Sequence, residues 1–390
     1  MLLFIPRFLV VLTAMLLAAN VMASRPLLIP SPPQIAATSY IMMDAYSGEI
    51  LVERNADERV DPASLTKLMT SYVADYELQQ GNITLSDMVP ISVNAWAQNF
   101  PGSSVMFLEA GRQVSVEDLL RGISVASGND ASVAIAEHIA GSEGAFVDIM
   151  NQHAQLMGLE NTRFANSHGL SHPDHYTTAR DMARLARARI MEFPDRYSIH
   201  SEREFTFNGI RQSNRNRLLW RDSSVDGLKT GYTQSAGYCL VASALRDDMR
   251  LITVVMGTRS EEARFQETQK LLSYGFRYYK TLKLYEQAQV VTQTRVWGGE
   301  SEQVSLVVTE DVYVTVPRSQ QDDIKADLSL DKYIQAPVKK GQELGEISLR
   351  IGNDVLRNQP VVAHHSVERG GIFTVLWSRI KLFFVKLFSG

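Results

Sequence analysis

The sequence is poor in cysteine, with one among its 390 residues. A single cysteine cannot form a disulfide within the chain, whatever the redox state of its compartment. Cys239 stands in the run Tyr-Cys-Leu-Val-Ala, which is typical of a buried strand. We therefore interpret Cys239 as a core thiol rather than a nucleophile.

An excess of charge of one sign is also lacking. Lysine plus arginine number 39 and aspartate plus glutamate 43, so the formal net charge is -4. Without a basic field, nucleic acid is not expected as a partner. The hydrophobic content of 45% and the charged content of 21% are ordinary for a globular protein, and the length allows two domains with appendages.

Long apolar runs are confined to the two ends of the chain. Arg7 precedes the apolar run Phe8–Ala19, and small residues follow up to Ala23. This pattern predicts a signal peptide, residues 1–23, that is cut after Ala23. An uncleaved anchor helix is the alternative, and under either interpretation the body of the protein is exported.

The C-terminal run, Ile372–Phe388, is rich in apolar and aromatic residues but is interrupted by Arg379, Lys381 and Lys386. These cations argue against a membrane-spanning helix. We expect residues 368–390 to form an amphipathic helix that lies in the headgroup layer of an anionic membrane. A terminal helix packed on the protein's own core is the alternative.

Residues 24–284 mix strand and helix patterns. A hairpin is predicted near Tyr40–Val52, and a helix then opens with Asp61 as N-cap and Pro62 at its first position. Further helices are predicted at Val116–Gly122, Asp130–Ala140, Ala145–Met157, Asp181–Met191 and Glu261–Tyr279, and strands at Glu204–Asn208, Tyr238–Leu245 and Arg250–Gly257. The last two strands are joined by a tight polar turn and should pair antiparallel. The expected fold class is α+β, an antiparallel sheet with flanking helices and a helical subdomain.

After about Leu284 the pattern changes to short strand-like runs separated by turn residues. Residues 285–367 are predicted to form a small β-sandwich domain. No cluster of catalytic residue types occurs in it, so we interpret this domain as a stalk or an interaction module.

Ser64 and Lys67 form the first of three short motifs, Ser-Leu-Thr-Lys. Ser64 falls in the first turn of the predicted helix, where free backbone N–H groups favour an alkoxide. Lys67 is three residues further on and shares the same helix face. A lysine can act as the base for this serine only if burial or a second cation lowers its pKa. An exposed lysine on an amphipathic helix is the alternative.

The second and third motifs are Ser127-Gly128-Asn129 and Lys229-Thr230-Gly231. Ser127, at a helix–helix junction, can pass a proton to a leaving amine, and Asn129 can hold a substrate carbonyl. Taken alone, however, that motif is only a turn and N-cap.

Lys229 is the candidate for the second cation that lowers the pKa of Lys67. Thr230 is placed to bind a terminal carboxylate, and Gly231 to let a substrate backbone approach closely. The N–H groups of Tyr232 and Ser64 form the candidate oxyanion hole.

Together the three motifs resemble the set shared by penicillin-binding proteins and serine β-lactamases. The chain is most similar to the low-molecular-mass penicillin-binding proteins that are serine-type D-alanyl-D-alanine carboxypeptidases, those like penicillin-binding proteins 5 and 6. The segments that carry the resemblance are Asp61–Lys67, Arg121–Ile123, Ser127–Asp130, His168–Leu170, Ala179–Met182 and Val225–Gly231. The signal peptide, the small β domain and the amphipathic tail extend it over essentially the whole chain.

The resemblance implies an enzyme that removes the terminal D-Ala from peptidoglycan stem peptides through an acyl-enzyme at Ser64 and that binds β-lactams. It implies Lys67 as base, Ser127 as proton relay and Asn129 as a substrate-binding amide. Lys229 and Thr230 would line the carboxylate pocket, joined by Arg215 and Arg264. It implies no cofactor or metal, and a place at the periplasmic face of the bacterial inner membrane. The sequence leaves open whether the chain forms a homodimer.

The chain departs from its close relatives at Tyr232, where they often carry histidine. The backbone N–H of Tyr232 is unaffected by this change, but a contribution of the side chain to rate or pH dependence is left open.

Four other functions are alternatives to this one. A class A β-lactamase would carry Glu-x-x-Leu-Asn between Ser127 and Lys229, and this chain has no such segment. The sequence does not distinguish DD-endopeptidase action on cross-links from carboxypeptidase activity. A metallopeptidase would need a third ligand near His172-Pro173-Asp174-His175, which we interpret as a polar loop. A catalytically silent cell-wall scaffold is disfavoured because Ser64, Lys67 and Lys229 are all present.

Overall fold

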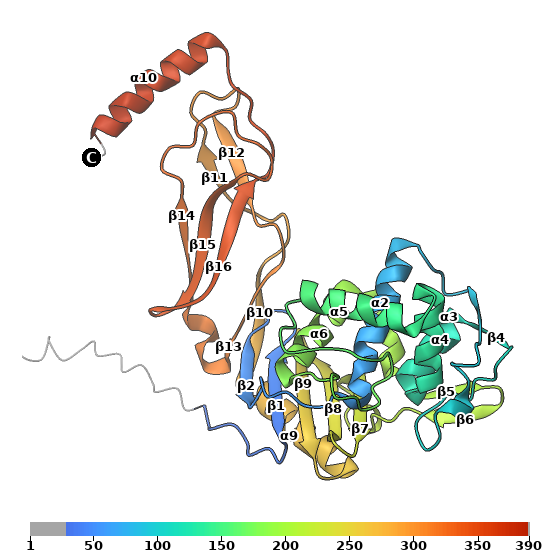
Figure 1. Ribbon diagram of the computed structural model, residues 1–390. Helices are drawn as coiled ribbons and strands as arrows, with labels where there is room; N and C mark the ends of the chain where they lie inside the picture. The colour runs from blue at the N-terminus through green and yellow to red at the C-terminus, as the bar shows by residue number, and fades with distance from the viewer. Residues whose placement is uncertain (1–28, 389–390) are drawn as a thin grey trace, which may run out of the picture. The chain divides into compact units, whose positions relative to one another are not determined.

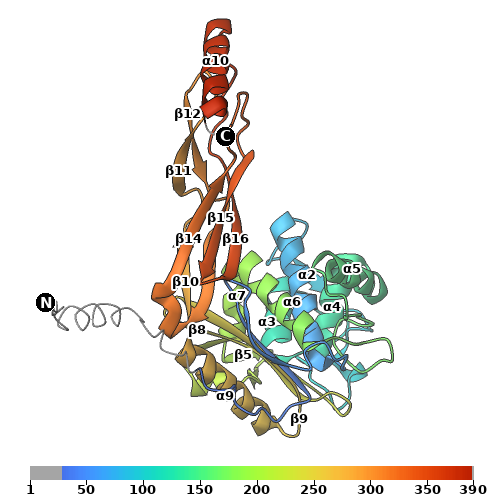
Figure 2. The same cartoon turned by 90° about the vertical axis from the view of Figure 1, so that its left-hand side faces the viewer.

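The computed structural model describes residues 29–388 of the chain (Figure 1). The predicted signal peptide, residues 1–23, lies outside the described residues. An antiparallel sheet with flanking helices is followed by an all-β region and a final helix (Figure 1 and Figure 2). This arrangement confirms the predicted α+β fold class.

A five-stranded antiparallel sheet organises the first part, in the order β2-β1-β9-β8-β7. Its strands are β1 (Ser39–Asp44), β2 (Ile50–Arg54), β7 (Val225–Thr233), β8 (Gly237–Arg246) and β9 (Met249–Thr258). The predicted hairpin and the predicted antiparallel pair β8–β9 are both confirmed. Within this sheet β7 pairs only with β8, so its other edge is free where it carries the Lys-Thr-Gly motif.

Helices cover both faces of this sheet, with α6 (Ala179–Glu192) and α9 (Glu261–Tyr278) on opposite sides (Figure 1). Alternate residues of β1 serve the two faces. Ile41 shares a core with α6, whereas Met42 lies against α9, where a Cβ added at Gly275 would be 2.8 Å from the Met42 sulfur. Because both faces are covered, all six residues of β1 are buried.

The helical subdomain packs around a second apolar core. Its helices are α2 (Lys67–Gln80), α3 (Val116–Arg121), the π-helix η3 (Gly122–Ala126) and α4 (Asn129–Ala140), and α5 (Glu143–Leu156) packs next to α4. Two hairpins complete it, β3 (Met88–Pro90) with β4 (Gln113–Ser115) and β5 (Glu204–Phe207) with β6 (Ile210–Ser213). Shorter helices are η1 (Ala63–Thr66), η2 (Ala97–Asn99), α7 (Pro194–Tyr197), η4 (Ser198–Ser201) and α8 (Leu218–Arg221). Helix α2 contributes Leu68 to the first core and Leu78 to the second, so the turn that carries Ser64 is anchored from both sides.

The all-β region contains a two-stranded sheet, β10 (Tyr279–Tyr285) with β13 (Val312–Pro317), and a five-stranded sheet in the order β11-β12-β16-β15-β14. The remaining bounds are β11 (Val290–Arg295), β12 (Gln303–Val307), η5 (Arg318–Asp323), β14 (Ile324–Leu330), β15 (Glu343–Ile351) and β16 (Asp354–Ala363). Residues of both sheets share one apolar core. Strands β10 and β16 were not predicted, because β10 directly continues the pattern of α9 and β16 contains Pro360.

Helix α10 (Ile372–Phe388) forms where the sequence predicted it. It touches the β region through Leu382, which is 6% exposed, and through Ser378, whose Oγ accepts the Gly298 N–H over 2.7 Å. Its aromatic side chains are exposed, namely Phe373, Trp377, Phe383, Phe384 and Phe388. Among residues 29–388, no helix is long and apolar enough to cross a membrane.

Candidate active site

Ser64 lies in the short 3-10 helix η1, which leads directly into α2. The prediction of an Asp61 N-cap followed by an α-helix from Pro62 was wrong in detail, because Pro62 is the N-cap and the first turn is 3-10. Asp61 Oδ1 still accepts the Ala63 N–H over 2.8 Å, which satisfies one free donor of that turn.

Backbone contact from Gly169 shapes the same turn. Ala63 has φ +47°, an uncommon value for a residue with a side chain. A Cβ at Gly169 would lie 1.9 Å from the Ala63 carbonyl oxygen, and Gly169 itself has φ +92°. Only glycine therefore permits the loop at Gly169 to press against the residue before Ser64.

Lys67 is buried, with 1% of its surface exposed, and its Nζ lies 3.1 Å from Ser64 Oγ. The same nitrogen donates to Asn129 Oδ1 over 2.7 Å and to the His168 carbonyl over 2.5 Å. Burial lowers the pKa of Lys67 to about 7, against the opposing charge of Asp130 and with help from Arg215. The lysine is thus buried rather than exposed, and it meets the condition for a base near neutral pH.

Ser127 follows the π-helix η3 and has the left-handed φ of +62°. Its Oγ accepts a hydrogen bond from Lys229 Nζ over 2.8 Å, and the same Nζ donates to the Thr230 carbonyl over 3.0 Å. Burial is the main cause that lowers the pKa of Lys229, and the positive charges of Lys67, Arg215 and Arg264 lower it further. The second and third motifs therefore meet at this serine–lysine contact.

Gly231 lines the cleft and also packs closely against the turn that carries Ser64. A Cβ at Gly231 would lie 3.2 Å from the Ala63 Cβ and 3.2 Å from the Pro62 carbonyl oxygen. The glycine therefore lets β7 approach η1 closely, and it brings the Lys-Thr-Gly strand beside Ser64.

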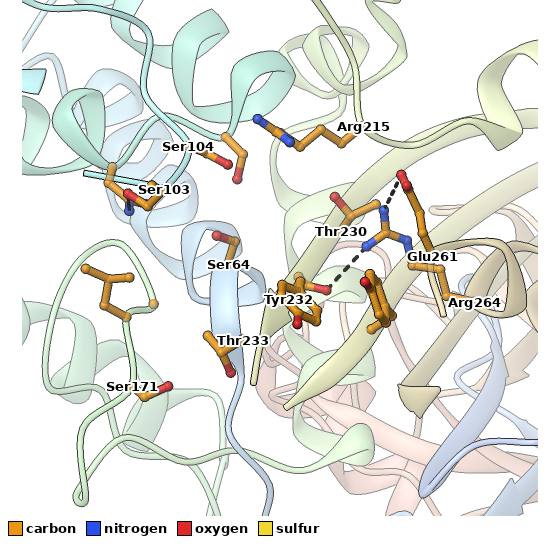
Figure 3. A pocket seen from close by; sticks show the side chains of 17 residues that line it. Ser64, Ser103, Ser104, Ser171, Arg215, Thr230, Tyr232, Thr233, Glu261 and Arg264 are labelled. Carbon is orange, nitrogen blue, oxygen red and sulfur yellow. Dashed lines mark hydrogen bonds and ion pairs between the residues drawn. The ribbon is translucent and has the colours of Figure 1, made fainter. Parts of the chain in front are cut away.

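A cleft of about 560 Å³ opens at this junction (Figure 3). The expected site residues that line it are Ser64, Ser127, Asn129, Arg215, Thr230, Gly231, Tyr232 and Arg264. Lys67 and Lys229 are not in this lining, and they touch it through Ser64 and Ser127. The arrangement offers a nucleophile with an adjacent base, a proton relay and two arginines that suit a carboxylate.

Several polar residues of the site were not given roles from the sequence. Glu261 Oε1 accepts from Arg264 Nη2 over 3.1 Å, while Arg264 Nη1 donates to the Gly231 carbonyl over 3.4 Å, so the guanidinium is held against β7 (Figure 3). Asp130, directly after the second motif, accepts the N–H groups of Met106 and Leu108 and thereby orders the loop over the cleft. The position of Asp130 directly after the second motif was the one feature of the sequence that indicated a role for it in the site.

His175, interpreted as part of a polar loop, is buried instead. Its Nδ1 accepts the Ala165 N–H over 2.8 Å, and its Nε2 lies 2.7 Å from Thr66 Oγ1. Burial lowers the pKa of His175 to about 4, so the ring is neutral. Nε2 thus contacts the turn that carries Ser64, while Nδ1 holds the loop at Ala165. The described residues contain no cluster of three or more metal-ligand side chains.

Two family models match the chain. The D-alanyl-D-alanine carboxypeptidase model, peptidase family S11, matches residues 27–260, and the model of the C-terminal domain of penicillin-binding protein 5 matches residues 279–369.

Individual relatives agree with the family models. The D-alanyl-D-alanine carboxypeptidase DacC of Escherichia coli (strain K12) is 47% identical over 363 residues, 92% of this chain and 90% of the relative. DacA of the same strain is 46% identical over 362 residues, with the same two coverages. The crystal structure of penicillin binding protein 5 from Haemophilus influenzae is similar, with a TM-score of 0.83 at 46% identity. The match covers 87% of this chain and 100% of the Haemophilus influenzae chain. The chain belongs to the S11 family of serine-type D-alanyl-D-alanine carboxypeptidases and is a penicillin-binding hydrolase.

Proposed function

We propose that Ser64 is the nucleophile of this carboxypeptidase and that the ten residues expected from the sequence carry out its reaction. The observation that supports the assignment best is the 3.1 Å contact between Ser64 Oγ and the buried Nζ of Lys67, whose pKa is about 7. A neutral amine at that distance can take the serine proton as the oxygen attacks.

In the proposed acylation, the terminal carboxylate of a stem peptide binds beside Thr230, Arg215 and Arg264. Ser64 Oγ attacks the carbonyl of the penultimate D-Ala while its proton moves to Lys67 Nζ. The N–H groups of Ser64 and Tyr232 stabilise the oxyanion. The C–N bond then breaks as the proton held by Lys67 passes through Ser127 to the leaving amine, and terminal D-Ala departs.

The proposed deacylation uses water as the second nucleophile. Lys67, neutral again, takes a proton from water, and the resulting oxygen attacks the ester carbonyl. Breakage of the ester returns a proton to Ser64 Oγ and releases the shortened peptide. Asn129 contacts Lys67 and lines the cleft, so it supports both the base and the substrate amide.

The experiment that tests this proposal is intact-mass measurement of the protein incubated with a penicillin, alongside Ser64→Ala. We expect one slowly decaying adduct on the wild-type chain and none on the variant. An adduct on Ser64→Ala would remove Ser64 as nucleophile. Rapid penicillin loss without an adduct would indicate β-lactamase turnover, and no adduct with intact penicillin would indicate a silent scaffold.

The proposal extends to the setting of the enzyme. The exposed aromatic residues and the three cations of α10 support attachment to an anionic membrane surface. We propose that the exported protein works at the periplasmic face of the bacterial inner membrane. The division into residues 1–23, 24–284, 285–367 and 368–390 is part of this proposal, with the β domain as the stalk. Light scattering of the detergent-solubilised chain distinguishes a monomer from a homodimer.

A further inference from the structure

One carboxylate beside the catalytic serine collects three hydroxyl groups from separate parts of the chain. Asp61 Oδ2 accepts from Ser171 Oγ over 2.6 Å, from Ser235 Oγ over 2.5 Å and from Thr233 Oγ1 over 3.1 Å. The serines and the threonine come from the loop after His168, the end of β7 and the β7–β8 turn. We call these four residues the Asp61 cluster.

The protons of the cluster point inward. A hydroxyl has one proton, and a carboxylate is the strongest acceptor within reach of all three. With its proton directed at Asp61, the Ser171 oxygen keeps lone pairs for other donors, whereas Thr233 Oγ1 also accepts the Ala236 N–H over 3.0 Å. Both residues line the cleft. Burial raises the pKa of Asp61, but the hydroxyls and the Ala63 N–H lower it further, so the carboxylate stays charged. This wall of the cleft therefore accepts hydrogen bonds, and the charged Asp61 lies directly behind its hydroxyl groups.

The opposite wall has the opposite character. Arg215, Thr230 and Arg264 lie on one side of Ser64, and Thr233 and Ser171 lie on the other (Figure 3). Arg264 is 4% exposed, and its Nε has no hydrogen-bond partner among the described residues. One end of the cleft thus has two arginines, of which Arg264 pairs with Glu261, and the other end has hydroxyl groups backed by Asp61, with the nucleophile between them.

The spacing along β7 assigns a substrate residue to each end. Thr230 and Thr233 are three residues apart, which in a strand spans about 10 Å. A peptide extended beside β7, with its terminal carboxylate near Thr230, then has the third residue from its C-terminus near Thr233. This step rests on the function proposed above, in which Thr230, Arg215 and Arg264 bind the carboxylate.

We infer that the Asp61 cluster is a specificity site that selects a side-chain ammonium on the substrate residue immediately before D-Ala-D-Ala. An ammonium has three donors and a positive charge, so it matches hydroxyl acceptors backed by a carboxylate. A neutral amide at the same position has no positive charge to interact with Asp61. Hydrogen bonds that involve a charged group are about twice as strong as neutral ones.

The test compares two substrates that differ only in this charge: Nα-acetyl-L-Lys-D-Ala-D-Ala and its Nα,Nε-diacetyl form. The full-length detergent-solubilised enzyme is assayed for D-Ala release, and the ratio of the two kcat/KM values is the readout. We expect the wild-type enzyme to prefer the free ammonium by about tenfold, mostly through KM. We expect Asp61→Asn and Ser171→Ala each to move the ratio toward one.

Asp57→Asn is the matched control for loss of a nearby charge. Asp57 is 61% exposed and pairs with Arg180 over 2.7 Å, outside the cleft. The ratio of the two kcat/KM values for Asp57→Asn should therefore stay at the wild-type value. Ser171→Ala keeps the contact between Asp61 and the Ala63 N–H, so it carries the test if Asp61→Asn does not fold. Equal cleavage of both substrates by the wild-type enzyme overturns the inference, as does a preference that both variants retain. Failure to cleave either substrate would instead count against the proposed function.

Discussion

The rate of acylation should depend on pH through the protonation of Lys67. Burial lowers the pKa of this lysine from 10.5 to about 7. At pH 7 about half of the molecules then carry a neutral Lys67, whereas an ordinary lysine would be neutral in about one molecule in 3,000. The shift corresponds to about 5 kcal/mol, at ~1.4 kcal/mol per unit of pKa.

We expect the acylation rate constant to rise about tenfold per pH unit below about pH 7 and to level off above it. The measurement is the second-order rate constant for a fluorescent penicillin across this range. Penicillin carries no group of its own that titrates there, so the limb of the profile reports the enzyme.

Arg215 gives a second test of the same argument. Its charge lowers the pKa of Lys67, so Arg215→Gln should move the rising limb to higher pH. Arg112→Gln is the matched control, because Arg112 is 73% exposed, pairs with Glu109 and does not line the cleft. A rate that is flat with pH, or a limb that stays in place in Arg215→Gln, would falsify the assignment of Lys67 as base.

Three further predictions concern other parts of the chain. Removal of Ile372–Gly390 should release the protein into the soluble fraction with its activity intact, and a truncated chain that still sediments with membranes contradicts the anchor assignment. Gly169→Ala should lower the free energy of unfolding by more than ~2 kcal/mol and slow acylation, because the new Cβ meets the Ala63 carbonyl at 1.9 Å. The control is Gly209→Ala, because Gly209 has φ +76° and a Cβ there would meet nothing within 4 Å. This variant should lower the free energy of unfolding, measured by thermal unfolding, by only about 1 kcal/mol. Equal losses of stability in the two variants would refute the steric argument. Asp75→Asn should destabilise by about 3 kcal/mol in urea unfolding, because it leaves the buried Arg189 without its counter-charge, and a change below about 1 kcal/mol would contradict this.

The parts of the site that local pattern specifies were predictable. Ser64 and Lys67 share a helix face through their spacing, and the turn between β8 and β9 joins neighbouring strands. The position of Ser127 at a helix junction followed from the apolar runs on either side.

What was missed depends on contacts between segments far apart in the chain. Asp61 looked like a simple helix cap, because nothing near it in sequence indicates that Ser171, Thr233 and Ser235 converge on it. The close packing of Gly231 against Ala63 was also not predicted, because the two residues are 168 positions apart in the chain. Asp130 opposes the lowering of the Lys67 pKa by burial and Arg215, and this effect depends on its position in the folded chain.

Cys239 has a practical consequence for the exported protein proposed above. Its side chain is 1% exposed, and burial raises its pKa to about 11, so almost no thiolate is available at neutral pH. A solvent-exposed unpaired thiol would cross-link copies of the protein during secretion, and this one is protected from that side reaction. The native chain should therefore be silent toward maleimide dyes. A cysteine introduced on its surface would then serve as a unique attachment point for a fluorophore or spin label, with no need to remove the natural one.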